Sequence, residues 1–179
     1  KNKNYIKKTL ASSYLTSGPV CEKAEKLLKS KFKKKYAILT NSWTNGLITI
    51  LLSLKIKPDD EIIIPACTFV ACANVIEMVG AKVVFADIDP STKLMDIEDC
   101  LKKISKKTKI IMPVHLYGNL FQTKNLKNKI RKNIIIIEDS AHAFCGEYHN
   151  NIIGKYADFL VFSFYATKSI TCGEGGAII

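Results

Sequence analysis

Lys168 lies in a stretch whose residue types could support covalent chemistry. It follows the apolar run Phe159-Leu-Val-Phe162, which predicts a buried strand, and it precedes Gly173, Gly175 and Gly176. A lysine among small and hydroxylated residues can lose its hydration, and its unprotonated amine then acts as a nucleophile. The ordinary alternative is a solvated loop lysine, because the chain carries 27 lysine and arginine residues in all.

Other polar and aromatic side chains follow the remaining predicted strands, at the point where each strand ends. In open α/β sheets, ligands bind beyond the carboxyl ends of the strands. The residues at these positions are Ser42, Trp43, Thr44, Asn45, Thr68, Phe69, His115, Asp139, His142, Ser163 and Lys168. Hydroxyls, an aromatic ring, a carboxylate, imidazoles and an amine on one rim predict a single binding site there.

Five of these residues have an ordinary structural alternative beside the functional one. Asp139 is either a functional carboxylate or a helix cap. Thr44 and the backbone N–H groups around it either bind a phosphate at a helix start or only cap that helix. Ser163 binds a ligand or ends a strand, Phe69 stacks on a ligand or joins the core, and His142 contacts a ligand or is satisfied structurally.

Apolar runs and periodic segments alternate along the chain, and this alternation predicts the elements that position the site. Strands are predicted at 36–40, 61–65, 82–86, 108–114, 133–138 and 159–162, and helices at 20–31, 44–54, 68–79, 96–103 and 123–132. Thr68 is expected to cap its helix, whereas residues 1–20 show little periodicity. The alternation favours right-handed crossovers and an α/β fold with a mostly parallel sheet.

Composition narrows the classes of partner. The formal net charge is +11, but nearly all of it is lysine and Arg131 is the only arginine, which argues against nucleic-acid recognition. Six cysteines without a Cys-x-x-Cys pair and three histidines provide no zinc-site spacing, so no metal is expected. The uncharged run 62–76 is too short to cross a membrane and no secretory signal opens the chain, so a cytoplasmic protein is expected.

The lysine segment Ser163-Phe-x-x-x-Lys-x-x-x-x-Gly-Glu-Gly-Gly176 resembles that of the DegT/DnrJ/EryC1/StrS family of pyridoxal-phosphate-dependent sugar aminotransferases. Further blocks that resemble this family are 41–47, 60–71, 83–89, 113–118 and 138–143. The resemblance therefore covers almost the whole chain. Lysine rather than histidine at position 168 argues against the related sugar dehydratases, which lack the Schiff-base amine.

The resemblance implies pyridoxal 5′-phosphate as the cofactor, with Lys168 and Asp139 as the catalytic residues. Lys168 matches the lysine that holds the cofactor as a Schiff base. Asp139 matches the carboxylate that pairs with the pyridine nitrogen and keeps it protonated, so that the ring acts as an electron sink. His142 matches a residue that neighbours the ring.

The same resemblance implies the remaining cofactor contacts. Thr44 and Ser163 match the phosphate-binding residues, and Phe69 matches the stacking aromatic residue. Trp43 stands where glycine is usual, so we expect a different backbone in the phosphate turn and an indole that crowds the ring. Asp59 also replaces a glycine, in what is expected to be a surface turn.

For the whole chain, the resemblance implies a fold-type I, aspartate-aminotransferase-like large domain with helices on both faces of its sheet. The implied reaction moves an amino group from an amino acid, with glutamate the expected donor, to a keto-sugar nucleotide. Alternatives are transamination of a cyclitol or another keto substrate, and a non-catalytic fragment or binding module. Residues 1–179 are expected to be the cofactor-binding large domain, truncated before a small carboxyl-terminal domain, and the full-length protein is expected to form a homodimer.

Overall fold

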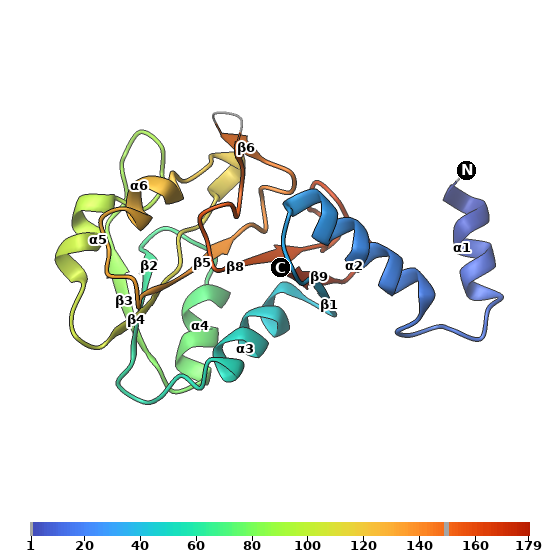
Figure 1. Cartoon of the computed structure of the whole chain (residues 1–179), viewed down its shortest axis with the longest axis horizontal. Helices are drawn as coiled ribbons and strands as arrows, with labels where there is room; N and C mark the ends of the chain where they lie inside the picture. The colour runs from blue at the N-terminus through green and yellow to red at the C-terminus, as the bar shows by residue number, and fades with distance from the viewer. Residues whose placement is uncertain (1, 149–150) are drawn as a thin grey trace.

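The computed structural model of the chain describes residues 2–148 and 151–179. Its strands are β1 (Ile38–Thr40), β2 (Glu61–Pro65), β3 (Lys82–Ala86), β4 (Thr108–Ile111), β5 (Ile135–Asp139), β6 (Glu147–Tyr148), β7 (Asn151–Ile152), β8 (Phe159–Ser163) and β9 (Gly176–Ile178). Seven of them form one sheet in the order β1-β9-β8-β5-β4-β2-β3, while β6 and β7 pair separately (Figure 1).

The central part of the sheet is parallel, as the sequence predicts. β3, β2, β4, β5 and β8 pair in parallel along the sheet. β9 is the exception, because it runs antiparallel to both β8 and β1. The chain leaves β8 at Ser163 and returns at Gly176, which pairs with Ser163. The lysine segment is therefore the loop that joins two adjacent strands.

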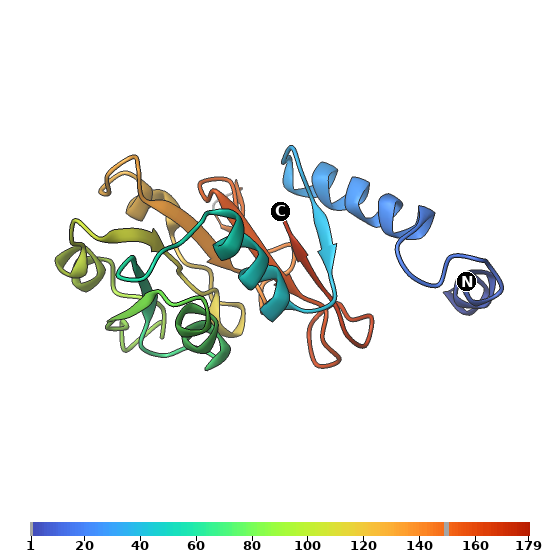
Figure 2. The ribbon, with the colours of Figure 1, turned by 90° about the horizontal axis from the view of Figure 1, so that it is seen from below.

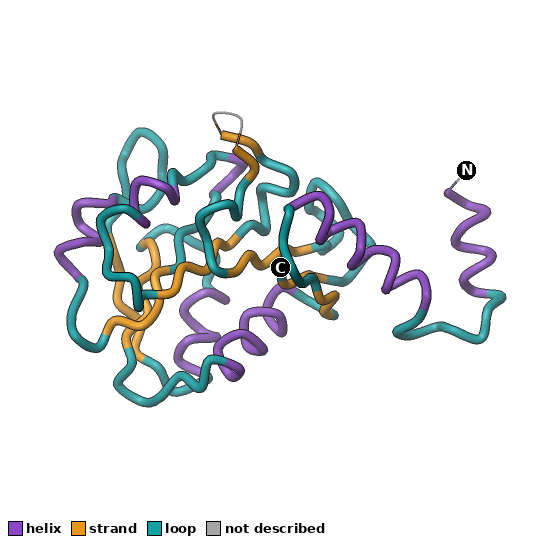
Figure 3. Tube along the Cα trace, in the orientation of Figure 1, coloured by secondary structure: helices purple, strands orange, loops and turns teal. Residues whose placement is uncertain are grey.

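Helices cover both faces of the sheet, which confirms the predicted fold class. They are α1 (Asn2–Leu10), α2 (Pro19–Phe32), α3 (Trp43–Ser53), α4 (Ala71–Met78), α5 (Ile97–Lys103), α6 (Thr123–Lys127) and the 3-10 helix η1 (Leu116–Gly118). Figure 3 shows the strands between two groups of helices. α3 and α4 pack on one face, and α5, α6 and the end of α2 pack on the other.

The isoleucines of β5 show why this sheet is covered on both sides. Ile137 belongs to the apolar cluster under α3 and α4, whereas Ile136 belongs to the cluster under α5 and α6. Both side chains are fully buried. Because successive side chains of a strand point to opposite faces, a continuous apolar run is typical of a strand buried on both faces.

Several predicted boundaries are wrong for identifiable reasons. β4 ends at Ile111 rather than at 114, since Pro113 has no N–H to continue the ladder. α6 ends at Lys127 rather than at 132. Just after this end, the Lys129 N–H donates to the Leu126 carbonyl in a tighter turn. The helix expected from Thr68 begins at Ala71, and its N-cap residue makes no side-chain cap, so Thr68 is not a cap.

The amino-terminal segment departs most from the sequence-based expectation. α1 forms within residues 1–20, where little periodicity is visible, and its described large apolar side chains are exposed. Figures 1 and 2 show α1 and the start of α2 extending away from the sheet. A helix without a buried face leaves no apolar pattern to predict it from. Within the described residues, no helix is long and apolar enough to cross a bilayer.

Candidate active site

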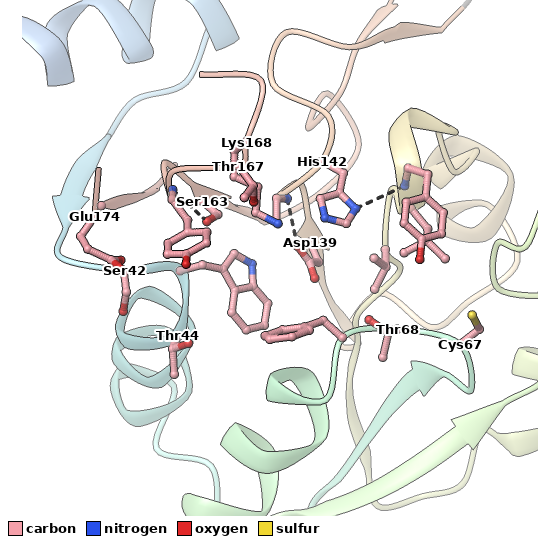
Figure 4. Close-up of a pocket in the computed structure, with 18 residues that line it drawn as sticks. Ser42, Thr44, Cys67, Thr68, Asp139, His142, Ser163, Thr167, Lys168 and Glu174 are labelled. Atoms are coloured by element: carbon pink, nitrogen blue, oxygen red, sulfur yellow. Dashed lines mark hydrogen bonds between the residues drawn. The ribbon is translucent and has the colours of Figure 1, made fainter. Parts of the chain in front are cut away.

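A cavity of about 480 Å³ lies beyond the carboxyl ends of β5 and β8 and against the start of α3 (Figure 4). The seven residues predicted to contact the cofactor all line it, namely Trp43, Thr44, Phe69, Asp139, His142, Ser163 and Lys168. Further lining residues are Ser42, Cys67, Thr68, Val114, Leu116, Tyr117, Ala141, Tyr165, Thr167, Glu174 and Gly175. The structure therefore brings together residues that the sequence places on four separate segments.

Asp139 is the buried acid of the cavity. It ends β5, and its side chain is almost fully buried. Oδ1 accepts a hydrogen bond from the Ala141 N–H at 3.0 Å, and Oδ2 accepts one from Cys72 Sγ at 3.4 Å. Burial raises the pKa of Asp139, and these two donors act in the opposite direction. Residues 140–146 contain turns and no helix, so the helix-cap alternative is wrong.

His142 is held in one orientation by Tyr117. The Tyr117 N–H donates to His142 Nδ1 at 3.3 Å, and the two rings stack with centroids 5.6 Å apart. Because Nδ1 accepts this hydrogen bond, the neutral imidazole carries its proton on Nε2. Burial and then the charge of Lys168 lower the pKa of His142, while Asp139 opposes them. The imidazole is therefore a neutral N–H donor on the cavity wall.

Tyr117 is a site residue that sequence reasoning missed. It has a left-handed backbone conformation with φ of 52°, which is uncommon for residues other than glycine. Its side chain is 81% exposed, so no burial pattern marks it. The aromatic residue inside the block 113–118 was the available signal, but its contact with His142 depends on the fold.

The start of α3 forms the wall opposite Asp139. Ser42 caps the helix, since its Oγ accepts a hydrogen bond from the Asn45 N–H at 3.1 Å. Thr44 is half-buried in the first turn. Trp43 is accommodated in regular helical backbone, 94% buried, with an indole Nε1 that has no hydrogen-bond partner among the described residues. Backbone N–H groups and a positive dipole end make such a helix start suitable for a phosphate.

The loop after β8 brings Lys168 to the same cavity. Its backbone N–H donates to the Tyr165 carbonyl at 3.0 Å, while Ser163 Oγ accepts from the Tyr165 N–H at 3.3 Å. In Figure 4 the side chains of Lys168, Asp139 and His142 converge on one part of the cavity. The amine, the carboxylate and the imidazole thus face a common space.

The glycine that opens β9 permits this arrangement. A Cβ on Gly176 would lie 2.6 Å from the Ser42 carbonyl carbon and 2.8 Å from the Phe162 carbonyl oxygen. Both neighbours are backbone and cannot move aside cheaply. A side chain at position 176 would therefore push β9 away from the cap of α3, and the loop that carries Lys168 would shift with it.

His115 and Asn45 do not line the cavity, so their prediction as site residues is wrong. His115 is buried toward the other side of β5, where its Nε2 lies 3.2 Å from Glu138 Oε2. His115 Nδ1 accepts from the Phe121 N–H at 2.9 Å. Asn45 points to solvent, where its Nδ2 donates to Asn41 Oδ1. Position after a strand does not tell which face of the sheet a side chain takes.

The lining residues fit pyridoxal phosphate. An amine for the aldehyde, a buried carboxylate for the pyridine nitrogen, and hydroxyls at a helix start for the phosphate surround one cavity. Phe69 also lines the cavity, and its aromatic ring is 68% exposed. The ring is therefore free to stack on a ligand and is not part of the core. The core alternative for Phe69 is therefore wrong.

Comparisons with known proteins agree with this fit. Residues 1–179 match the DegT/DnrJ/EryC1/StrS aminotransferase family. The chain is 36% identical to GDP-perosamine synthase of Escherichia coli O157:H7, over all of this chain and 50% of that protein. It is 42% identical to an uncharacterized protein of Methanocaldococcus jannaschii, over 98% of this chain and 46% of that one.

Solved structures show the same fold. PseC of Helicobacter pylori, an aminotransferase involved in the biosynthesis of pseudoaminic acid, has a TM-score of 0.93 and 33% identity, over 99% of this chain and 48% of its own. NtdA of Bacillus subtilis with bound pyridoxamine phosphate has a TM-score of 0.91 and 35% identity, over 98% of this chain and 40% of its own.

These matches confirm the predicted fold type and, for the family, the predicted cofactor. The neighbours include pyridoxal-phosphate and pyridoxamine-phosphate forms. The chain spans about half the length of the curated relatives that it matches. On the family match over residues 1–179, the chain belongs to the DegT/DnrJ/EryC1/StrS aminotransferase family.

Proposed function

We propose that the protein transfers an amino group from an amino acid to a keto-sugar nucleotide with pyridoxal phosphate. The observation that carries this proposal is the placement of Lys168 and buried Asp139 on the walls of one cavity. An amine that attaches an aldehyde and a carboxylate that keeps a pyridine nitrogen protonated are the two groups that this chemistry requires. The family match supports the same reaction class.

The residues that would hold the cofactor come from three segments. Lys168 Nζ would attach it covalently, and Asp139 would pair with its ring nitrogen. Thr44, Ser163 and the N–H groups at the start of α3 would bind the phosphate. Bound pyridoxal phosphate supplies an electron sink for the negative charge that develops on the donor's α-carbon.

The chain's own residues supply the proton transfers and the orientation. With its amine free, Lys168 Nζ would act as the base that accepts the proton from the donor's α-carbon. Asp139, kept ionised, would hold the proton on the ring nitrogen. His142 offers its Nε2–H from the wall beside them, and its stacking on Tyr117 keeps the imidazole from rotating. Phe69 and Trp43 would form the cavity wall next to the cofactor ring on the side of α3 and α4.

The proposed substrates are glutamate and a sugar nucleotide with a keto group. GDP-perosamine synthases among the relatives support the sugar class. The net charge of +11 is consistent with a diphosphate-bearing substrate, because a positive surface raises the local concentration of anions. We further propose that residues 1–179 are the cofactor-binding domain of a cytoplasmic homodimer, with a smaller domain that closes over the substrate.

The test is an assay of the purified protein with pyridoxal phosphate, glutamate and a panel of keto-sugar nucleotides, in which 2-oxoglutarate is measured. The expected result is 2-oxoglutarate formed in proportion to aminated sugar, and none with the Lys168→Ala variant. The sugar-nucleotide assignment would be rejected if the protein reacts with glutamate but aminates no sugar nucleotide in the panel, and if it turns over a keto-cyclitol instead.

A further inference from the structure

Asp139 is contacted from α4 by a cysteine that the proposed chemistry does not use. Cys72 is fully buried, and its Sγ lies 3.4 Å from Asp139 Oδ2. The same sulfur lies 3.2 Å from Thr68 Oγ1. Thr68 lines the cavity, so a row of three polar groups leads from the cavity wall to the buried carboxylate.

The chemistry of the three groups fixes the direction of the hydrogen bonds. An ionised carboxylate only accepts, so the Cys72 S–H donates to Asp139 and the Thr68 O–H donates to Cys72 Sγ. Burial and the charge of Asp139 raise the pKa of the Cys72 thiol far above its usual range. The thiol therefore keeps its proton at neutral pH and remains a donor.

Asp139 has a specific need for such a donor. Its burial disfavours the ionised form, which is the form that holds a proton on a pyridine nitrogen. The Ala141 N–H and the Cys72 S–H are the donors that oppose this effect within the described residues. The titratable groups that face Asp139 from other segments are Cys72, His142 and Lys168, while His115 acts on its pKa through charge from the other side of β5.

We propose that Cys72 is a positioning residue for the amino-transfer reaction. Its S–H keeps Asp139 ionised and fixes one carboxylate oxygen, so that the remaining lone pairs point into the cavity. The ordinary alternative, a small apolar residue that fills the core beside α3, does not require a sulfur at hydrogen-bond distance from both Thr68 and Asp139. The role in catalysis rests on the proposed function, whereas the contact itself belongs to the cofactor-free protein.

The first test is an NMR titration of the Asp139 carboxyl carbon in cofactor-free protein labelled with 13C-aspartate. Loss of the signal in Asp139→Asn assigns the resonance. In Cys72→Ala we expect the titration to move to higher pH, which corresponds to an about tenfold lower ratio of ionised to protonated Asp139. Cys72→Ser restores a donor of similar size, so its titration should stay near that of the wild type.

Cys100→Ala is the matched control. Cys100 is equally buried, but it belongs to α5 and packs on the opposite face of the sheet. We expect no change in the Asp139 titration there. An unchanged titration in Cys72→Ala, or equal shifts in Cys72→Ala and Cys100→Ala, would overturn the role of Cys72.

A second measurement is the dissociation constant for pyridoxal phosphate at neutral pH. We expect about tenfold weaker binding in Cys72→Ala and near-wild-type binding in Cys72→Ser and Cys100→Ala. Wild-type protein that binds no pyridoxal phosphate would overturn the proposed function. Wild-type binding that Cys72→Ala leaves unchanged would overturn only the proposed role of Cys72.

Discussion

Two buried acids sit side by side at the end of β5 and face opposite sides of the sheet. Glu138 is surrounded by protein donors, since Oε1 accepts from the Thr123 hydroxyl, and Oε2 accepts from the Gly154 N–H and lies 3.2 Å from His115 Nε2. Asp139 receives hydrogen bonds from Ala141 and Cys72, and it also lines a cavity. A carboxylate offers about four acceptor positions.

Glu138 and Asp139 differ in whether their hydrogen-bonding capacity is used by the fold or left for the cavity. Most acceptor positions of Glu138 face protein groups and connect the segments around β5. Few of its acceptor positions therefore remain for a ligand. Asp139 keeps unused capacity directed at the cavity, although burial makes its charge costly. A buried charge with incomplete protein partners indicates a functional site more strongly than burial alone.

The largest expected effect is on the rate of Asp139→Asn. Asparagine keeps the shape but cannot hold a proton on the ring nitrogen, so we expect the single-turnover rate with glutamate to fall by about two to four powers of ten. Stopped-flow absorbance of the loaded protein measures this rate. An unchanged rate in Asp139→Asn with cofactor bound would show that Asp139, like Glu138, is not needed for the chemistry.

Glu138→Gln should show the converse, a loss of stability without a comparable loss of chemistry. An amide keeps only one of the two acceptor oxygens of the carboxylate, so at least one donor loses its partner, which should lower the free energy of unfolding by about 1–3 kcal/mol. Urea denaturation measures it, with Asp139→Asn as the control of equal chemical change. A Glu138→Gln variant that is stable but catalytically dead would contradict the comparison.

The smallest expected effect is on the pH dependence of stability. Because burial raises the pKa of Asp139 in the folded state, its protonated form favours folding, and the stability it contributes at low pH is lost as pH rises through the folded pKa. The difference in unfolding free energy between Asp139→Asn and the wild type should therefore grow with pH across that range. A difference that is constant from acid to neutral pH would show that Asp139 titrates normally.

Sequence patterns predicted the parts of the fold in which local signals and packing agree. The runs 61–65 and 82–86 match β2 and β3 at both ends, because apolar strands there are bounded by turn residues. The pairing of β9 between β1 and β8 could not be predicted, since it depends on contacts between distant segments. α1 was not predicted because its described large side chains are exposed and the helix therefore has no buried apolar face.

The sequence predicts which residues follow the strand ends, and most of these reach the cavity. It does not predict the face of the sheet toward which each side chain points. Lys168, Asp139 and His142 follow strands and reach the cavity, but His115 also follows a strand and faces away. Cys72 is 67 residues from Asp139 in the sequence, and nothing in its local pattern marks the contact. Contacts of that kind are set by how α4 packs on the sheet.

The most direct test of the account asks where the cofactor attaches. The protein is incubated with pyridoxal phosphate, reduced with borohydride, digested and mapped by mass spectrometry, with Lys168→Ala treated in parallel. We expect a visible absorbance that reduction removes and a pyridoxyl group on Lys168, both absent from the variant. A pyridoxyl group on another lysine, or equal labelling of the Lys168→Ala variant, would contradict this expectation.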